Sequence, residues 1–298
     1  MSLERIRRLS EELGCVFAQR EPLSPHVTLG IGGRALFYVK PASWSAAERV
    51  LMALWEEDLP FRVLGGGSNL LVADGDLPFG VVHLRRLGGT VRWAGTKAEA
   101  DADVPLPALA AESVRRGLAG LEGMGGVPGT LGGAVVMNAG AFGNEVSRIL
   151  KEVGLIERGR GLTWRPASEF TLGYRRTDIA GRGVLAACRL GFFHEDAAAL
   201  LARFEEAKAR RNATQPWKEA TAGSVFKNPP GDHAGRVLEA LGFKGRRWGD
   251  AGFSSLHANF LVNCGGASFE DAWGLCEEAR RAAEGYGIEL EYEMEVWR

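Results

Sequence analysis

The 298-residue sequence contains little that would support metal or disulfide chemistry. Its four cysteines, Cys15, Cys188, Cys264 and Cys276, form no CxxC pair, and none stands at metal-ligand spacing with a histidine. The five histidines are scattered, without an HxH or HxxxH pair. We therefore expect free, mostly buried thiols. The sequence gives no support for a metal site.

Long apolar runs and an excess of one charge are also missing. No uncharged apolar stretch reaches the roughly 18 residues that a membrane-spanning helix needs. The start, MSLERIRRLSEELG, is charged and has no apolar signal core, so we expect a cytoplasmic protein with no membrane partner. The net charge of −1 argues against nucleic-acid binding driven by phosphate attraction. Nothing indicates an obligate protein partner, and a small anionic ligand needs only a few local Arg or Lys.

Glycine, by contrast, is abundant, with 41 residues, and clustered glycine lets a backbone pack closely against another group. Helical and strand-like patterns alternate along the whole chain, which indicates a mixed α and β protein with boundaries near residues 84 and 204. We predict helices over 2–14, 43–57, 106–116, 195–211, 234–241 and 269–286, and strands over 61–64, 80–84, 151–158, 183–193 and 258–263.

The segment GGGSN, residues 65–69, follows a predicted strand. Three glycines leave consecutive main-chain N–H groups able to face an anion, and Ser68 and Asn69 add side-chain donors. The segment matches neither a P-loop nor the GxGxxG dinucleotide fingerprint. Phosphate binding and a simple tight turn are equally compatible with it.

A second glycine-rich segment, GGVPGTLGGAVVMNAGAFG, covers residues 125–143. The longer stretch that contains it, residues 117–146, is too apolar for a flexible linker, and we expect no regular element there because glycine is so frequent. Either a flat ligand or a neighbouring backbone could approach it closely. We favour ligand binding, because Thr130, Asn138 and Asn144 interrupt apolar sequence.

Two short motifs carry polar groups that could do chemistry. GYRRTD, residues 173–178, sets Arg175 beside Arg176, which would face opposite sides of a strand. One could meet a carboxylate, although a solvated pair at a sheet edge is the commoner arrangement. AGSVFKNP, residues 222–229, places Ser224 among small residues, where a hydroxyl could act or could simply cap a turn. It is no GxSxG elbow, and no histidine lies nearby in the sequence.

The C-terminus alternates acidic and apolar residues. In a strand, Glu291, Glu293 and Glu295 would share one face. That face could be a solvent-exposed sheet edge, or one of the three carboxylates could reach an active site. The pattern alone does not choose among them.

Taken together, these motifs resemble the UDP-N-acetylenolpyruvoylglucosamine reductase family, the MurB flavoenzymes of bacterial peptidoglycan precursor synthesis. The resemblance spans nearly the whole chain. Two of its motifs are specific to the family: the glycine-rich GxPGTxGGAxxxNAGA and the serine-containing AGSVFKNP. It is carried, in order, by GIGG (30–33), GGGSNLLV (65–72), GGVPGTLGGAVVMNAGAFG (125–143), GYRRTD (173–178), AGSVFKNP (222–229) and HANFLVN (257–263).

The resemblance implies an α+β fold of three domains. Two α/β-type domains, 1–84 and 85–204, would bind FAD, and 205–298 would form an α+β substrate-binding domain. The last strand could return to the FAD domains. The stretch between Arg175 and Ser224 is short, so the chain resembles the shorter form of the family, which lacks an extra tyrosine-bearing loop.

The resemblance also implies the reaction. NADPH would reduce FAD, and the reduced flavin would pass hydride to C3 of the enolpyruvyl group of UDP-N-acetylglucosamine enolpyruvate, giving UDP-N-acetylmuramate. Ser224 matches the proton donor to C2, and Arg175 matches the residue that polarises the substrate carboxylate. The family's terminal Leu-Glu-x-Glu-Val pattern reads LEYEM here and points to Glu293. Met294 and Glu295 depart from that pattern, so the choice of glutamate stays open.

We expect tightly but noncovalently bound FAD on the two glycine-rich segments. The sugar diphosphate would lie on residues that flank the serine, since Arg and Lys suit phosphate and Asn can bind a hydroxyl or carbonyl. The predicted cofactor residues are Gly65, Gly66, Gly67, Ser68, Asn69, Gly126, Pro128, Gly129, Thr130, Gly133, Asn138, Gly140 and Ala141, and the predicted substrate residues are Arg211, Gln215, Lys227 and Asn228.

Two other functions are compatible with these residues. One is a different FAD-dependent oxidoreductase of the same fold, such as an oxidase of small alcohols or sugars. The other is a non-catalytic flavin-binding protein, in which NADPH would not reduce the flavin. The joint presence of Ser224, Arg175 and Glu293 argues against the second.

Overall fold

The structure is a computed structural model that describes residues 2–298. These residues form two compact units that alternate along the chain. Unit 1 runs up to Gln19 and then contains Phe37–Gly66 and Pro78–Arg210, whereas unit 2 contains Arg20–Leu36, Gly67–Leu77 and Arg211–Arg298. The division into three contiguous domains at 84 and 204 stays a prediction. Among the described residues, no helix combines the length and apolar character needed to cross a bilayer.

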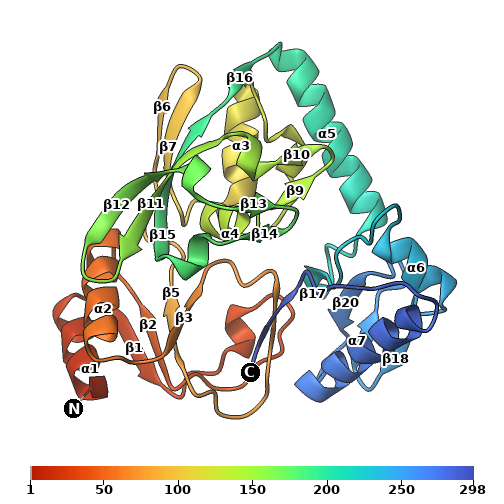
Figure 1. The fold of residues 1–298 in the computed structure, drawn as a ribbon, viewed down its shortest axis with the longest axis horizontal. Coiled ribbons are helices and arrows are strands. Elements are labelled where there is room, and N and C mark those ends of the chain that lie inside the picture. Colours follow the sequence, from red (N-terminus) through yellow and green to blue (C-terminus); the bar gives the residue numbers. More distant parts are fainter. Residues whose placement is uncertain (1) are drawn as a thin grey trace. The chain divides into compact units, whose positions relative to one another are not determined.

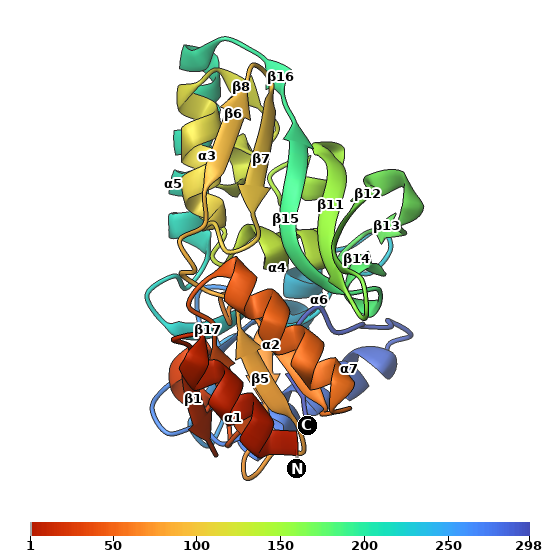
Figure 2. The ribbon, with the colours of Figure 1, turned by 90° about the vertical axis from the view of Figure 1, so that its left-hand side faces the viewer.

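The first sheet of unit 1 has four strands in the order β1-β2-β5-β3 (Figure 1). β5 pairs in parallel with both β2 and β3, and β1 closes the sheet antiparallel to β2. Helices α1 and α2 pack on it and share its apolar core (Figure 2). The bounds are β1 (Val16–Gln19), β2 (Phe37–Lys40), β3 (Phe61–Leu64), β5 (Gly80–His83), α1 (Ser2–Glu12) and α2 (Trp44–Glu56).

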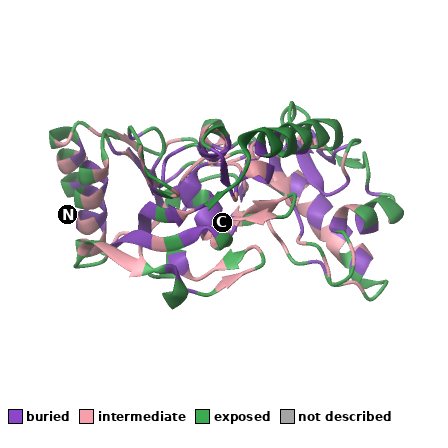
Figure 3. Ribbon diagram, turned by 90° about the horizontal axis from the view of Figure 1, so that it is seen from above, coloured by how far each residue is buried: buried purple, intermediate pink, exposed green. Residues whose placement is uncertain are grey.

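Local signals set the ends of several helices, as the sequence predicts. Ser43 caps α2, since its hydroxyl accepts a hydrogen bond from the Ala46 N–H at 3.2 Å. Ser268 begins α7 (Phe269–Glu284) in a reciprocal capping box with Asp271. Each long helix carries buried and exposed residues along its length, as the ribbon coloured by burial shows (Figure 3). The apolar face of each amphipathic helix therefore fixes the side that packs on its sheet.

The second sheet of unit 1 is antiparallel, in the order β12-β11-β15-β7-β6. Helices α3 and α4 contribute to its core together with Leu155 and Cys188. The bounds are β6 (Val91–Ala94), β7 (Lys97–Asp101), β11 (Leu150–Glu157), β12 (Gly161–Pro166), β15 (Val184–Gly191), α3 (Leu106–Arg115) and α4 (Leu131–Val136). Three short antiparallel ribbons complete the unit: β8 (Leu118–Ala119) with β16 (Phe193–His194), β9 (Gly140–Ala141) with β10 (Asn144–Glu145), and β13 (Leu172–Gly173) with β14 (Arg176–Thr177).

Helix α4 corrects one expectation from the sequence. We expected no regular element in the glycine-rich stretch 117–146, yet Leu131–Val136 is helical. Thr130 caps this helix by accepting the Gly133 N–H at 3.4 Å. A Cβ on Gly132 would lie 2.9 Å from the Cβ of Ala102, so glycine here permits close packing of the helix. Glycine frequency alone was a poor guide because packing contacts compensate for its low helix propensity.

Unit 2 is built on a four-stranded antiparallel sheet in the order β17-β20-β19-β18. Helices α6 and α7 share one apolar core with it, and the parallel pair β4–β21 adds Leu71 to that core. Helix α5 carries the chain from residue 210 of unit 1 to residue 211 of unit 2. The bounds are β4 (Leu70–Val72), α5 (Ala197–Thr214), β17 (Ala220–Ser224), α6 (Ala234–Ala240), β18 (Arg247–Trp248), β19 (Ala251–Phe253), β20 (Phe260–Asn263) and β21 (Glu295–Trp297).

Five single-turn 3-10 helices lie in the connections of the two units. They are η1 (Ser24–His26), η2 (Glu122–Met124), η3 (Val146–Arg148), η4 (Ala167–Glu169) and η5 (Ile179–Gly181).

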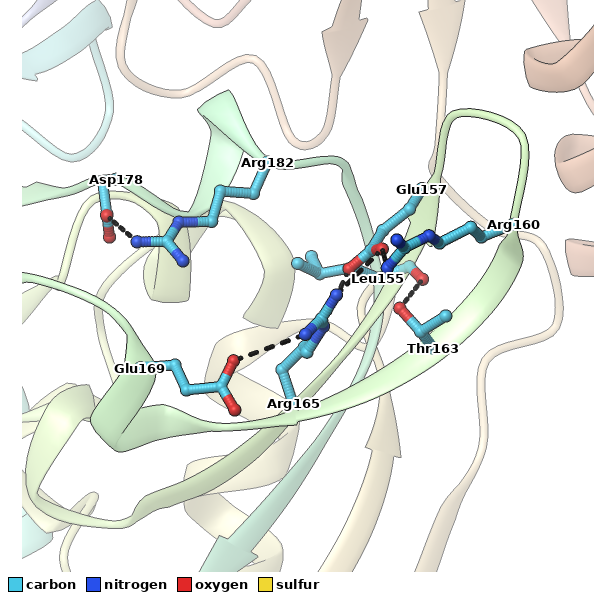
Figure 4. A network of polar contacts seen from close by, with 8 residues as sticks. All are labelled: Leu155, Glu157, Arg160, Thr163, Arg165, Glu169, Asp178 and Arg182. Carbon is cyan, nitrogen blue, oxygen red and sulfur yellow. Dashed lines mark hydrogen bonds and ion pairs between the residues drawn. The ribbon is translucent and has the colours of Figure 1, made fainter.

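The β11–β12 hairpin carries a network of ion pairs (Figure 4). Arg165 donates two hydrogen bonds to Glu157 across the two strands, at 3.0 and 3.2 Å. Arg160 and Glu169 extend the network at 3.7 and 3.6 Å. The hydrogen bonds from Arg165 hold the pKa of Glu157 below its usual range. The carboxylate is therefore favoured in the folded state.

Replacing Gly80 by alanine should destabilise the first sheet. A Cβ on Gly80 would overlap the ring of Phe37, which is fully buried. Overpacking of this kind costs about 1–3 kcal/mol. Gly181→Ala is the matched control, because a Cβ there would meet no heavy atom within 4 Å. Denaturant unfolding of both variants checks this, and equal stability of the two would show that Phe37 does not pack over Gly80.

Acid should weaken the contribution of Glu157 to stability. A carboxylate whose pKa is lowered by folding stabilises the protein above its unfolded pKa, and this contribution is lost as pH falls through the folded pKa. Glu157→Gln should therefore lower the free energy of unfolding at pH 7, by no more than about 1 kcal/mol. The difference from the parent chain should shrink below about pH 4. Glu205→Gln, at an exposed position of α5, is the control and should show no such pH-dependent difference.

Candidate functional site

The two glycine-rich segments meet within unit 1. Gly65 and Gly66 follow β3, and a Cβ on Gly66 would lie 2.7 Å from the Cα of Gly129. A Cβ on Gly65 would lie 2.9 Å from the Thr130 hydroxyl oxygen. Only glycine lets the two main chains approach so closely. The structure thus brings together four of the residues predicted to bind the cofactor.

His83 supports this contact and was missed from the sequence. Its side chain is buried at the end of β5, where Nε2 lies 3.1 Å from the Gly65 carbonyl oxygen. Nδ1 lies 2.7 Å from the Tyr38 hydroxyl. If Nε2 donates to Gly65, then Nδ1 accepts from Tyr38, which fixes the neutral tautomer. The only sequence signal was a histidine inside an otherwise apolar strand, GVVHL.

Asn138 organises the end of the second glycine-rich segment. It is buried, with a φ of +42°, and its Nδ2 donates to the Gly173 carbonyl at 2.8 Å. Its Oδ1 accepts the Ser147 N–H at 3.1 Å. Both ends of the amide are therefore engaged within unit 1. Gly140 and Ala141 follow directly in β9.

Arg175 lies against this same segment. From the sequence, we considered Arg175 and Arg176 as neighbours in one strand. In the structure, Arg175 instead occupies the turn between β13 and β14, with a φ of +52°. Its guanidinium donates to the carbonyls of Asn138 and Gly140, at 3.4 and 2.5 Å, and stacks 4.9 Å from the Tyr174 ring centre. Arg176 is exposed. The hairpin turn thus gives the two arginines different surroundings.

In unit 2, the rest of the GGGSN loop packs on a different neighbour. Gly67 has a φ of +66°, and a Cβ there would overlap the His26 carbonyl oxygen. The Gly67 carbonyl accepts the Thr28 N–H at 2.9 Å. Asn69 donates through Nδ2 to the Glu293 carbonyl at 3.0 Å. Ser68 lies between these two anchored residues.

Ser224 is the last residue of β17, just after an irregularity in its pairing with β20. The chain that follows is fixed by Asn259, which is buried and which the sequence did not single out. Asn259 donates to the Phe226 carbonyl at 2.8 Å and accepts the Phe226 N–H at 3.0 Å. Its own carbonyl accepts the Val225 N–H at 2.9 Å. Such a double amide contact holds the backbone beside Ser224 rigidly.

The three C-terminal glutamates have different surroundings. Glu291 is exposed and pairs with the Lys227 ammonium at 3.0 Å. Glu295 accepts the Trp297 indole N–H at 2.8 Å. Glu293 is half-buried, and its N–H donates to the Val225 carbonyl at 2.8 Å, one residue after Ser224. Of the three glutamates, Glu293 is thus the one whose main chain bonds to the residue after Ser224.

The predicted C-terminal strand is shorter than the alternating pattern suggested. Only Glu295–Trp297 forms a ladder, in parallel with β4. Residues 291–294 instead run beside residues 225–227 and pair only through the bridge between Phe226 and Tyr292. A shared strand face for all three carboxylates is therefore wrong.

The predicted substrate residues all lie in unit 2, and two of them hold polar atoms without partners. Within residues 2–298, the half-buried Arg211 guanidinium forms no hydrogen bond or ion pair, and burial lowers the pKa of Arg211 to about 10. The Oε1 of Gln215 is buried and has no hydrogen-bond partner there either. The Gln215 N–H donates to the Arg211 carbonyl at 2.9 Å, one helical turn back. Buried polar atoms without partners are costly, which fits a site that receives a polar ligand.

Lys227 and Asn228 are already engaged with the protein. Lys227 is paired with Glu291, as described, and is itself largely buried. The Oδ1 of Asn228 accepts the Ala234 N–H at the start of α6, at 3.1 Å. An anion at Lys227 would therefore have to displace the Glu291 carboxylate.

Comparisons with known proteins agree across the whole chain. Residues 35–165 match the family model of an FAD binding domain, and residues 215–297 match that of the C-terminal domain of UDP-N-acetylenolpyruvoylglucosamine reductase. UDP-N-acetylenolpyruvoylglucosamine reductase 2 of Symbiobacterium thermophilum is 38% identical over 99% of this chain and 96% of its own length. The corresponding enzyme of Alkalilimnicola ehrlichii is 40% identical over 93% of each chain.

A solved structure agrees with these relatives. The crystal structure of UDP-N-acetylenolpyruvylglucosamine reductase (MurB) from Thermus caldophilus aligns with a TM-score of 0.80 at 36% identity, over 95% of this chain and 99% of that one. The expected mixed α+β FAD-binding fold is thereby confirmed.

Proposed function

Because the chain belongs to the UDP-N-acetylenolpyruvoylglucosamine reductase family, we propose that Ser224, Arg175 and Glu293 carry out the chemistry of that family here. The activity is the FAD-dependent reduction of UDP-N-acetylenolpyruvoylglucosamine in peptidoglycan precursor synthesis. Similarity over 99% of the chain is the observation that carries this conclusion.

The residues of unit 1 fit FAD. The FAD-binding family match, 35–165, includes both glycine-rich segments, whose main chains touch at Gly66 and Gly129. The main-chain N–H groups of glycines are not covered by side chains, so they can bind the oxygens of a pyrophosphate. Thr130 adds a hydroxyl. When bound, noncovalently, FAD supplies the hydride that it has received from NADPH.

Ser224 donates the proton to C2 of the substrate in this proposal. A hydroxyl is a poor acid in water, but it can protonate a strongly basic carbon held beside it. This requires a fixed position, because small displacements of a reacting group are costly. The backbone that Asn259 holds after Ser224 supplies that rigidity.

Arg175 stabilises the charge that develops on the substrate carboxylate. Its guanidinium donates hydrogen bonds to the carbonyls of Asn138 and Gly140, which help to hold it in place within unit 1. Fixed positive charge aimed at developing negative charge favours the transition state over the ground state. Glu293, which lies in unit 2, is the third residue that membership of the family assigns to this chemistry.

The sugar diphosphate binds to unit 2 in this proposal. Arg211 offers a guanidinium that has no partner among residues 2–298 and suits a phosphate oxygen, and Gln215 offers a buried amide. Lys227 would exchange Glu291 for a substrate anion, while Asn228 contributes its remaining amide group. The unmet polar atoms of Arg211 and Gln215 support this assignment most directly.

Ser224→Ala should separate the two half-reactions. NADPH should reduce the FAD of the variant at close to the parent rate, because the hydroxyl acts only on the substrate. Reoxidation of the reduced flavin by the enolpyruvyl nucleotide should slow by at least roughly 10²–10⁴-fold. Ser224→Cys should recover part of the activity, since a thiol can also give a proton. Anaerobic stopped-flow absorbance measures both rates.

Ser254→Ala is the matched control for that experiment, as Ser254 is a buried serine of the same unit with a locally bonded hydroxyl. It should leave both half-reactions unchanged. Equal slowing of both half-reactions in Ser224→Ala, or of neither, would mean that Ser224 is not the proton donor. Failure of NADPH to reduce the parent flavin would favour a non-catalytic flavin protein.

Arg211→Ala should raise the KM for the nucleotide roughly 10–100-fold, the effect of losing a charged hydrogen bond. The rate of FAD reduction by NADPH should stay near normal. Removal of a buried charge that has no partner should leave the stability of the ligand-free protein unchanged or raise it. Steady-state kinetics and thermal unfolding test both effects, with the adjacent Arg210→Ala as control. An unchanged KM, or a collapse of flavin reduction, would place the diphosphate elsewhere.

A further inference from the structure

The peptide groups of Glu293 are held on both sides within unit 2. Its N–H donates to the Val225 carbonyl at 2.8 Å, and the Met294 N–H reaches the same oxygen at 3.3 Å. Its carbonyl accepts a hydrogen bond from the Asn69 Nδ2 at 3.0 Å. One anchor is therefore the residue after Ser224, and the other is the last residue of the GGGSN loop.

Asn69 also aligns the strand that follows Glu293. The Asn69 carbonyl accepts the Glu295 N–H at 3.0 Å, immediately before the parallel ladder of β4 and β21 begins at Leu70 and Glu295. The ladder ends where the Ala73 N–H donates to the Trp297 carbonyl at 2.7 Å. The side chain and the main chain of Asn69 thus bond to residues on either side of Met294, which is buried. This pins the backbone of residues 293–295 from one side.

Fixing both the N–H and the carbonyl of a residue sets the direction of its Cα–Cβ bond. For Glu293, this decides where a three-torsion side chain can place its carboxylate. Active-site groups lose about 10²-fold in rate when they move by as little as 1 Å. A single amide that holds the Glu293 carbonyl can therefore matter for catalysis without touching a substrate.

We propose that Asn69 is a positioning residue that acts on the substrate half-reaction through Glu293. The inference rests on the proposed role of Glu293. It differs from the expectation that Asn69 serves the cofactor with its side-chain donor, because one Nδ2 hydrogen is given to the Glu293 carbonyl. The GGGSN loop then has two structural roles. Its glycines lie close to a neighbouring main chain, and Asn69 orients Glu293, which is 224 residues away in the sequence.

The test uses the FAD-loaded enzyme and two variants, Asn69→Ala and Asn69→Asp. The second keeps the size of the side chain but removes the Nδ2 donor. Both should retain FAD, measured by visible absorbance and by titration of the apoprotein with FAD, and NADPH should reduce both within roughly threefold of the parent rate. Flavin reoxidation by the enolpyruvyl nucleotide should slow roughly 10–100-fold at saturation, with little change in KM.

Asn263→Ala is the matched control, because the Nδ2 of Asn263 also donates to a main-chain carbonyl of unit 2, that of Leu29, at 3.1 Å. It removes this bond, and also the two that the Asn263 Oδ1 accepts from the N–H groups of Gly265 and Ala267, without touching Glu293. Its reoxidation rate should therefore stay near normal. The double variant Asn69→Ala/Glu293→Gln should reoxidise no more slowly than Glu293→Gln alone, since residues that act as one unit are not additive.

Each other outcome overturns a defined part of the argument. Loss of FAD affinity in both Asn69 variants would make Asn69 a cofactor ligand. Equal slowing in Asn263→Ala would reduce Asn69 to a stabilising residue, and multiplied effects in the double variant would make it independent of Glu293. Normal reoxidation in Asn69→Ala, with slow reoxidation in Glu293→Gln, would sink this inference alone. Normal reoxidation in Glu293→Gln would instead remove the proposed role of Glu293.

Discussion

The loop at residues 65–69 is the constraint on which most of the site depends. Its first two glycines let main chains touch in unit 1, where Gly66 meets Gly129. Its third, Gly67, adopts a left-handed φ of +66° directly against the His26 carbonyl in unit 2. Neither contact tolerates a Cβ, so side chains are excluded for steric reasons before any ligand is considered. The main-chain groups that remain are those we assign to FAD.

The sequence predicts the elements whose causes are local. The helix over 43–57 and its Ser43 cap, the strand over 61–64 and the helix begun by Ser268 are confirmed, because capping and periodicity act within a few residues. The predictions that proved wrong concern segments whose conformation is set by contacts with residues far away in the sequence. The short helix α4 depends on packing against Ala102, and the C-terminal segment follows its partners at 225–227 instead of the period of its own side chains.

The same distinction divides the site residues. Motifs located the segments that matter, but not the polar residues that hold them. Asn259 bonds to a residue 33 positions away, and His83 to a carbonyl 18 positions away. Asn259 lies inside the HANFLVN motif and His83 lies in none, but neither contact can be read from the sequence because only the fold creates it. The role that we infer for Asn69 has the same origin, even though Asn69 lies inside a recognisable motif.

The arginines show how the chain separates structural from functional charge. Arg165 has a structural role, since its guanidinium forms an ion pair with Glu157 in the β11–β12 hairpin. Arg211, by contrast, lies half-buried and forms no hydrogen bond or ion pair among residues 2–298. Keeping such a charge is costly for the ligand-free fold. An anionic substrate removes that cost only when it binds, so the free energy of desolvation already present in the protein adds to affinity for the anion. We therefore base the proposed substrate site on the unmet polar atoms of Arg211 and Gln215.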